Sequence, residues 1–175
     1  MSDENAATPA IVEREAQPYA GIRRPVPEGV PAMVDEAFPE LYEWLSRHGV
    51  APAGPPILRC WRIDADGEPL LMEAGCPVAG SVPAKGEVRV DALPAGRYLS
   101  VTHVGPYRSD SEPDLGAARD TLLEFVEREG LVIARPLRGG GAELLCGVDR
   151  MLRSPTDTPD PADWTTEIEY LLDAD

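Results

Sequence analysis

The sequence is poor in basic residues, cysteine and histidine, and each shortage excludes a class of protein. Only 16 of its 175 residues are lysine or arginine, against 31 aspartates and glutamates, so the formal net charge is −15. A surface of this sign repels nucleic-acid phosphates, which argues against direct binding of DNA or RNA. The same charge attracts cations, small organic cations included. The alternative is that the charge serves only to keep the protein in solution.

The three cysteines are too few and too widely spaced for a metal centre. Cys60, Cys76 and Cys146 include no C-x-x-C pair, and the chain has only 2 histidines, so we expect no metal site. Their apolar contexts are typical of buried thiols in a reducing, cytoplasmic protein. No apolar run of roughly 18 residues and no signal peptide is present, so we expect no membrane contact. We expect no cofactor, because the glycine run at 139–141 lacks the lysine of a phosphate loop.

The apolar pattern predicts an α+β fold in a single domain at 9–175, after a disordered tail at 1–8. Apolar residues recur every three or four positions in two segments, 34–45 and 115–129, and a glycine follows each predicted helix. Pro39 lies inside the first segment, so that helix either begins or kinks there. Short extended pieces are predicted within 11–24, and alternating or apolar runs predict strands at 57–63, 70–74, 87–104, 143–152 and 164–172.

The two predicted helices belong to two halves of similar pattern. Each half reads strand, helix, strand, strand, over about 9–79 and about 86–172. Trp44 and Phe125 each lie five residues before the glycine that follows their helix. One such unit cannot bury its own apolar surface, so we expect the duplicated units to join into one antiparallel sheet with a shared core. A central groove between the halves is then the expected ligand site.

Acidic residues that alternate with apolar ones are candidates for this site. Glu167 and Glu169 lie opposite the apolar stripe of the last strand, so their face is either solvated or lines a cavity. Glu73 lies at the position of the first half that corresponds to Glu167, and the two glutamates are expected to face each other across the groove. Asp149 is placed to point into the same groove.

Two aromatic residues are candidates for the wall of the groove. Trp61 lies in the middle of a strand, where core packing is the alternative. Tyr107 follows a Gly-Pro turn, where local packing is the alternative. Ring faces attract flat cations by roughly 0.5–2 kcal/mol each. A carboxylate in the same apolar cavity has a raised pKa, which an entering cation lowers.

The order of several short motifs resembles the GyrI-like small-molecule-binding domain. The motifs are PAGRY at 94–98, HVGPY at 103–107, TP at 158–159 and TEI at 166–168. Together with the similar halves they carry the resemblance from about 9 to 172. This domain is also the effector-binding half of AraC-type and MerR-type multidrug regulators, whereas the chain resembles the standalone members, which have no DNA-binding segment.

The resemblance implies two helices on an antiparallel sheet, with a pocket of aromatic residues around an acidic one. It implies lipophilic, often cationic ligands, bound for sensing or sequestration. We interpret Glu167 as the charge partner, with Trp61, Tyr107, Glu73 and Asp149 also in the pocket. Family members often carry Glu-x-Tyr where this chain has Asp149-Arg150-Met151, so the acid is shortened and the tyrosine is lost.

Two alternatives stay open. Some members of the family are hydrolases that open strained cyclopropane rings in DNA-alkylating natural products, and Glu167 would then be the catalytic residue that assists water. The third reading is a gyrase-inhibitor-like interaction module with an unknown protein partner, in which the negative charge mimics DNA.

Overall fold

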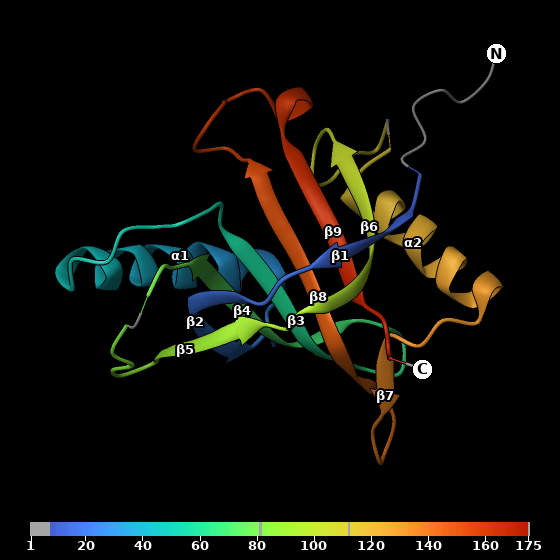
Figure 1. Ribbon diagram of the computed structural model, residues 1–175. Helices are drawn as coiled ribbons and strands as arrows, with labels where there is room; N and C mark the ends of the chain where they lie inside the picture. The colour runs from blue at the N-terminus through green and yellow to red at the C-terminus, as the bar shows by residue number, and fades with distance from the viewer. Residues whose placement is uncertain (1–7, 81, 112, 175) are drawn as a thin grey trace.

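The computed structural model describes residues 8–80, 82–111 and 113–174, so of the tail predicted to be disordered only Thr8 is described. Within these residues the chain forms nine strands, two α-helices and one short 3-10 helix (Figure 1). In chain order they are β1 (Ala10–Arg14), β2 (Gln17–Pro25), α1 (Val30–Arg47), β3 (Ile57–Ile63), β4 (Pro69–Pro77), β5 (Val88–Leu93), β6 (Gly96–Val104), α2 (Leu115–Glu129), β7 (Ala134–Pro136), β8 (Ala142–Arg153), η1 (Pro161–Asp163) and β9 (Thr165–Leu171).

The strands form one antiparallel sheet with a symmetric order. That order is β1-β6-β9-β8-β3-β4-β2-β5, and β7 pairs with β8 in addition. Along the chain, β2-α1-β3-β4 corresponds to β6-α2-β8-β9, with the short strand β7 inserted after α2. The two series meet where β3 pairs with β8. The predicted α+β class is therefore confirmed.

Both helices follow the predicted apolar periodicity, but α1 is longer than predicted. It begins at Val30 and runs through Pro39, so of the two predicted alternatives the helix does not begin at this proline. Gly49 after α1 and Gly130 after α2 have φ values of 63° and 64°, the left-handed conformation that glycine adopts without strain. The buried stripe of α1 is Met33, Ala37, Leu41 and Leu45. None of the helices in the described residues is long and apolar enough to cross a membrane.

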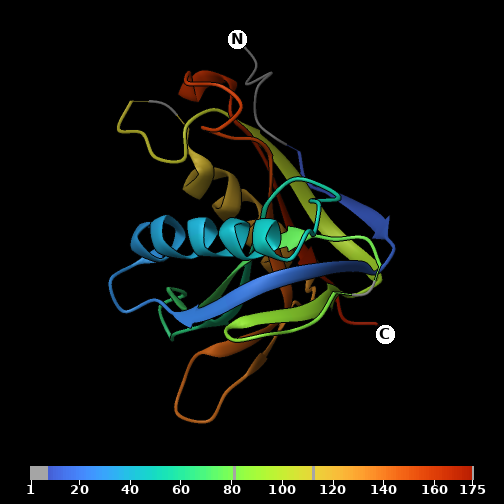
Figure 2. The ribbon, with the colours of Figure 1, turned by 90° about the vertical axis from the view of Figure 1, so that its left-hand side faces the viewer.

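The two helices pack on one face of the sheet, which we call the helix face (Figure 2). One buried cluster lies under α1 and a second under α2, and Cys60 of β3 packs against both. We call the other side the inner face. There the chain crosses from one edge of the sheet to the other twice, because β1 pairs with β6 and β5 with β2 (Figure 1).

A third buried cluster lies on the inner face and closes it. It joins residues of both edges to the central strands: Tyr19, Ile57, Leu93, Tyr98, Cys146 and Val148. The sheet therefore curls around these side chains, and charged residues beside them are also removed from water.

Candidate functional site

The last strand, β9, alternates as predicted. Ile168 and Tyr170 are buried with α2, whereas Glu167 and Glu169 project to the inner face. Glu169 is fully buried, and the side chain of Glu167 is 19% exposed. The glutamate face thus lies largely inside the molecule.

Two arginines neutralise this glutamate pair, one on the edge strand β1 and one on β8, the neighbour of β9 in the sheet. Nε of Arg14 donates to both oxygens of Glu169 at 3.1 and 3.2 Å, and its Nη2 lies 2.6 Å from Oε1 of Glu169 and 3.0 Å from Oε1 of Glu167. Nε of Arg150 lies 3.5 Å from Glu169 and 3.6 Å from Glu167. The site therefore has two cations for its two carboxylates.

The two glutamates differ in their proton affinity. Burial, the hydrogen bond with Glu169 and the negative charge of Glu169 raise the pKa of Glu167 from 4.5 to about 7. Burial also disfavours the charge of Glu169, but hydrogen bonds from Arg14 and Glu167 hold its pKa below the usual value. Glu169 is thus the permanent anion of the pair, and Glu167 is the group that titrates.

Glu73 lies in a second inner-face cluster, formed by β2, β3 and β4. It is fully buried, and its Oε1 accepts hydrogen bonds from the Tyr19 hydroxyl at 2.5 Å and from the Trp61 indole at 2.9 Å. Nη1 of Arg59 donates to the Tyr19 hydroxyl at 3.1 Å. The guanidiniums of Arg23 and Arg59 each lie over the Trp61 ring, 3.7 Å from its centroid. Trp61 thus belongs to a polar cluster and not to the apolar core.

The two inner-face clusters occupy equivalent positions in the two halves. Glu73 pairs across the sheet with Arg59, just as Glu167 pairs with Arg150. Both glutamates project to the inner face, with β8 and β3 between their strands. Three strand spacings separate them by roughly 14 Å.

Asp149 lies on the helix face, away from Glu167. In the sheet it pairs with Ile168, whose side chain is buried under α2. Oδ2 of Asp149 accepts a hydrogen bond of 2.6 Å from Nη2 of Arg119, and Nη1 of the same arginine donates to the Tyr170 hydroxyl at 3.0 Å. The expectation that Asp149 and Glu167 share one groove is therefore wrong, because they alternate across the sheet.

Tyr107 also lies on the helix face, in one of two aromatic pairs. Its ring centroid is 4.7 Å from that of Trp164, and on α1 the centroids of Phe38 and Tyr42 are 6.3 Å apart. Burial raises the pKa of Tyr107 and of Tyr42, and the charge of Asp157 adds to both shifts. Asp157 is therefore within electrostatic range of both tyrosines.

The sequence-based search overlooked the arginines, although they accompany every predicted acid. Five arginines contact a carboxylate or an aromatic residue of these clusters: Arg14, Arg23, Arg59, Arg119 and Arg150. Arg59 and Trp61 occupy alternate positions of one strand, which was the signal that they share a face.

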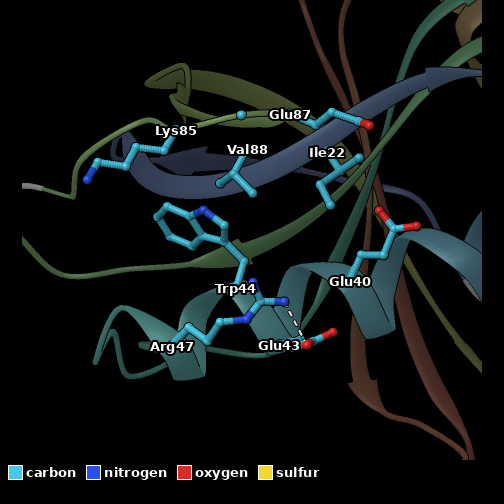
Figure 3. Close-up of a pocket in the computed structure, with 9 residues that line it drawn as sticks. Ile22, Glu40, Glu43, Trp44, Arg47, Lys85, Glu87 and Val88 are labelled. Atoms are coloured by element: carbon cyan, nitrogen blue, oxygen red, sulfur yellow. Dashed lines mark hydrogen bonds and ion pairs between the residues drawn. The ribbon is translucent and has the colours of Figure 1, made fainter.

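An open groove of about 350 Å³ lies elsewhere, between α1 and the segment that leads into β5 (Figure 3). Trp44 and Val88 contribute apolar surface to it. Its acidic residues Glu40, Glu43 and Glu87 are all paired with arginines, Arg24 and Arg47. A neutralised, solvent-exposed rim offers little attraction for a cation, and no predicted site residue lines this groove.

Comparison with known proteins shows to which family the chain belongs. The model of the GyrI-like small molecule binding domain family matches residues 7–139. The chain belongs to this family. This GyrI-like domain resembles the EcmrR C-terminal domain with a TM-score of 0.75 and 19% identity, over 97% of this chain and 99% of that one.

Two further structures resemble the GyrI-like domain. EcmrR in a complex with DNA matches equally well, but the domain spans only 59% of that chain. A hydrolase from Listeria innocua matches with a TM-score of 0.58 and 14% identity, over 94% of this chain and 91% of that one. A search of curated proteins gave no match. At these identities the structural matches establish a common fold.

The family match ends before β8 and β9, which carry Asp149 and Glu167. The functional assignment of these GyrI-like strands therefore rests on their own contacts. In the part of the chain that the structure describes, no group of three or more His, Cys, Asp or Glu side chains is arranged to hold a metal ion.

Proposed function

We propose that this GyrI-like domain binds lipophilic, aromatic cations on its helix face, for sensing or sequestration. The observation that carries the proposal is two aromatic pairs, Phe38 with Tyr42 and Tyr107 with Trp164, whose tyrosines both lie within electrostatic range of the carboxylate of Asp157. Each half of the chain supplies one pair. All four rings are partly exposed, as a ligand platform requires.

The Tyr107 side of this region has unused hydrogen-bonding capacity. The buried hydroxyl of Tyr107 has no hydrogen-bond partner among the described residues, and the same holds for the hydroxyl of Thr166. A buried polar group without a partner costs about 1–3 kcal/mol, so a ligand with a polar substituent would relieve that cost. This favours a ligand with an aromatic body and a polar edge.

The charge of the helix face favours a cation. Asp149 is neutralised by Arg119, whereas Asp157 accepts hydrogen bonds only from Ser154 and has no basic partner among the described residues. One carboxylate charge therefore remains beside the tyrosines. Ring faces and an unpaired carboxylate together select a flat cation over a neutral molecule.

We expect wild-type protein to bind rhodamine 6G in a fluorescence titration, and Tyr107→Leu to bind it roughly tenfold more weakly. Asp157→Asn should also weaken binding, because it removes the unpaired charge. The matched control is Phe125→Leu, which removes a partly buried ring at the end of α2. Equal affinity of all four proteins would contradict the proposal. Loss of all binding at high salt would also contradict it, because the dye would then be attracted only by the net charge of the protein.

A hydrolase is the second candidate, and the titration of Glu167 favours it. A carboxylate with a pKa of about 7 and 19% exposure is suited to accept a proton from water near neutral pH. If Glu167 acts in this way, incubation with a cyclopropane-containing electrophile yields the ring-opened hydrate, and Glu167→Gln abolishes it. Product analysis by mass spectrometry decides this: no hydrate above the buffer control rejects the hydrolase.

A further inference from the structure

The guanidinium of Arg23 lies on the inner face between two carboxylates. A cationic ligand could occupy the same position. Its Nη2 is 3.8 Å from Oε1 of Glu73 and 3.6 Å from Oδ2 of Asp91, and its plane lies over Trp61. Neither distance is a hydrogen bond, and Nε has no partner among the described residues. Arg23 is thus held by charge and ring attraction alone, and its side chain is 22% exposed.

The groups behind Arg23 are buried and fixed. Glu73 is fully buried, and its Oε2 has no hydrogen-bond partner, although a carboxylate has about four acceptor positions. Tyr19 and the indole of Trp61 orient Oε1, and Arg59 is only 4% exposed. Gly21 makes room for this carboxylate, because a Cβ there would lie 2.9 Å from Cγ of Glu73. The site has acceptor capacity that its own residues leave unused.

We propose that this cluster is a second binding site, for a small planar cation with N–H donors such as an amidinium or guanidinium. The ligand replaces the guanidinium of Arg23, stacks on Trp61 and donates to Glu73. The displaced Arg23 side chain turns to solvent, where its charge is hydrated. Without Arg23 the cluster holds Glu73 and Asp91 against Arg59, so it carries one net negative charge and favours a cation.

This arrangement makes Arg23 an internal competitor. The apparent affinity for the ligand is the intrinsic affinity multiplied by the fraction of molecules in which Arg23 has left the Trp61 ring. Because this fraction is small, the wild-type protein binds weakly. Removal of the competitor should therefore tighten binding, which is the reverse of what a ligand-contacting arginine would show.

The test is a benzamidine titration followed by the NMR signal of the Trp61 indole N–H, which donates to Glu73. We expect Arg23→Met to bind benzamidine about tenfold more tightly than wild type, with a shift of this signal. Arg24→Met is the matched control, because it removes the same charge from the next residue, whose partners are Glu40 and Glu87. Methionine keeps the aliphatic stem of the side chain, and Arg23→Gln provides a second variant should Arg23→Met fold poorly.

Three outcomes overturn the second site: an equal effect of Arg23→Met and Arg24→Met, an indole signal that does not respond, or an unchanged benzamidine affinity in isothermal titration calorimetry when Trp61→Leu is added to Arg23→Met. Tyr107→Leu should leave benzamidine binding intact, because Tyr107 lies on the other face. Failure of the rhodamine proposal and failure of this site are therefore separate results.

Discussion

Replacement of Glu169 by alanine is expected to lower the free energy of unfolding by roughly 3–5 kcal/mol. Glu169 is fully buried and accepts three hydrogen bonds from Arg14, while Arg150, whose side chain is 12% exposed, lies 3.5 Å away. The substitution leaves two arginines with Glu167 as their one remaining carboxylate. An uncompensated cation in a largely buried place is costly, and β1 loses its hydrogen bonds to Glu169, so that Glu167 is the remaining partner of Arg14 on β9.

Urea unfolding at neutral pH measures this loss. Glu13→Ala is the matched control, because Glu13 lies on the exposed side of β1 next to Arg14, and it should change stability by less than about 0.5 kcal/mol. A cost for Glu169→Ala below about 1 kcal/mol would mean that water solvates this cluster. The buried arrangement of Arg14 and Glu169 would then be refuted.

The parts of the fold that depend on local pattern could be predicted from the sequence. The apolar spacing of α1 and α2 and the glycines after them are read within about twenty residues, and so is the alternation of β9. Local pattern left open whether α1 begins or kinks at Pro39, because the cost of a proline inside a helix is set against the burial of the apolar stripe on the sheet, which depends on the rest of the fold.

The partners of the charged residues could not be predicted, because they come from distant strands. Arg14 and Glu169 are separated by 155 residues, and they meet only because β1 crosses to the edge beside β6. No local pattern specifies that crossing. For the same reason the sequence left open whether Glu169 is solvated or lines a cavity, whereas in the structure it is fully buried.

The predicted site residues do not all lie together in the structure. Glu73 and Trp61 do meet, in a direct hydrogen bond, and Tyr107 lies beside a second aromatic ring. Glu73 and Trp61 lie on the inner face, however, and Tyr107 lies on the helix face, so a single pocket cannot contain all three. Alternation within one strand shows which of its residues share a face. Only the register between β8 and β9 shows that Asp149 and Glu167 lie on opposite faces.

The stability of the domain is expected to fall by roughly 1–2 kcal/mol as the pH rises from about 5 to about 8, through Glu167. In the unfolded chain this carboxyl releases its proton near the ordinary value of 4.5, whereas the folded protein holds it up to about 7. Between these values the folded state binds more protons than the unfolded state, so stability decreases with rising pH. Glu169 acts in the opposite sense and below this window, because its pKa is lowered.

Glu167→Gln should remove this slope, because glutamine keeps the shape and does not ionise. At about pH 8 the variant should be more stable than wild type by roughly 1 kcal/mol, and at about pH 5 the two should differ little. Urea midpoints at several pH values measure the difference, with Glu13→Gln as a control that leaves the slope unchanged. Parallel pH profiles of wild type and Glu167→Gln would show that Arg14 and Arg150 keep Glu167 ionised in the folded state. A carboxylate held ionised in this way has a lower pKa and is a weaker proton acceptor for a hydrolase, so the same measurement also tests the observation on which the second candidate function rests.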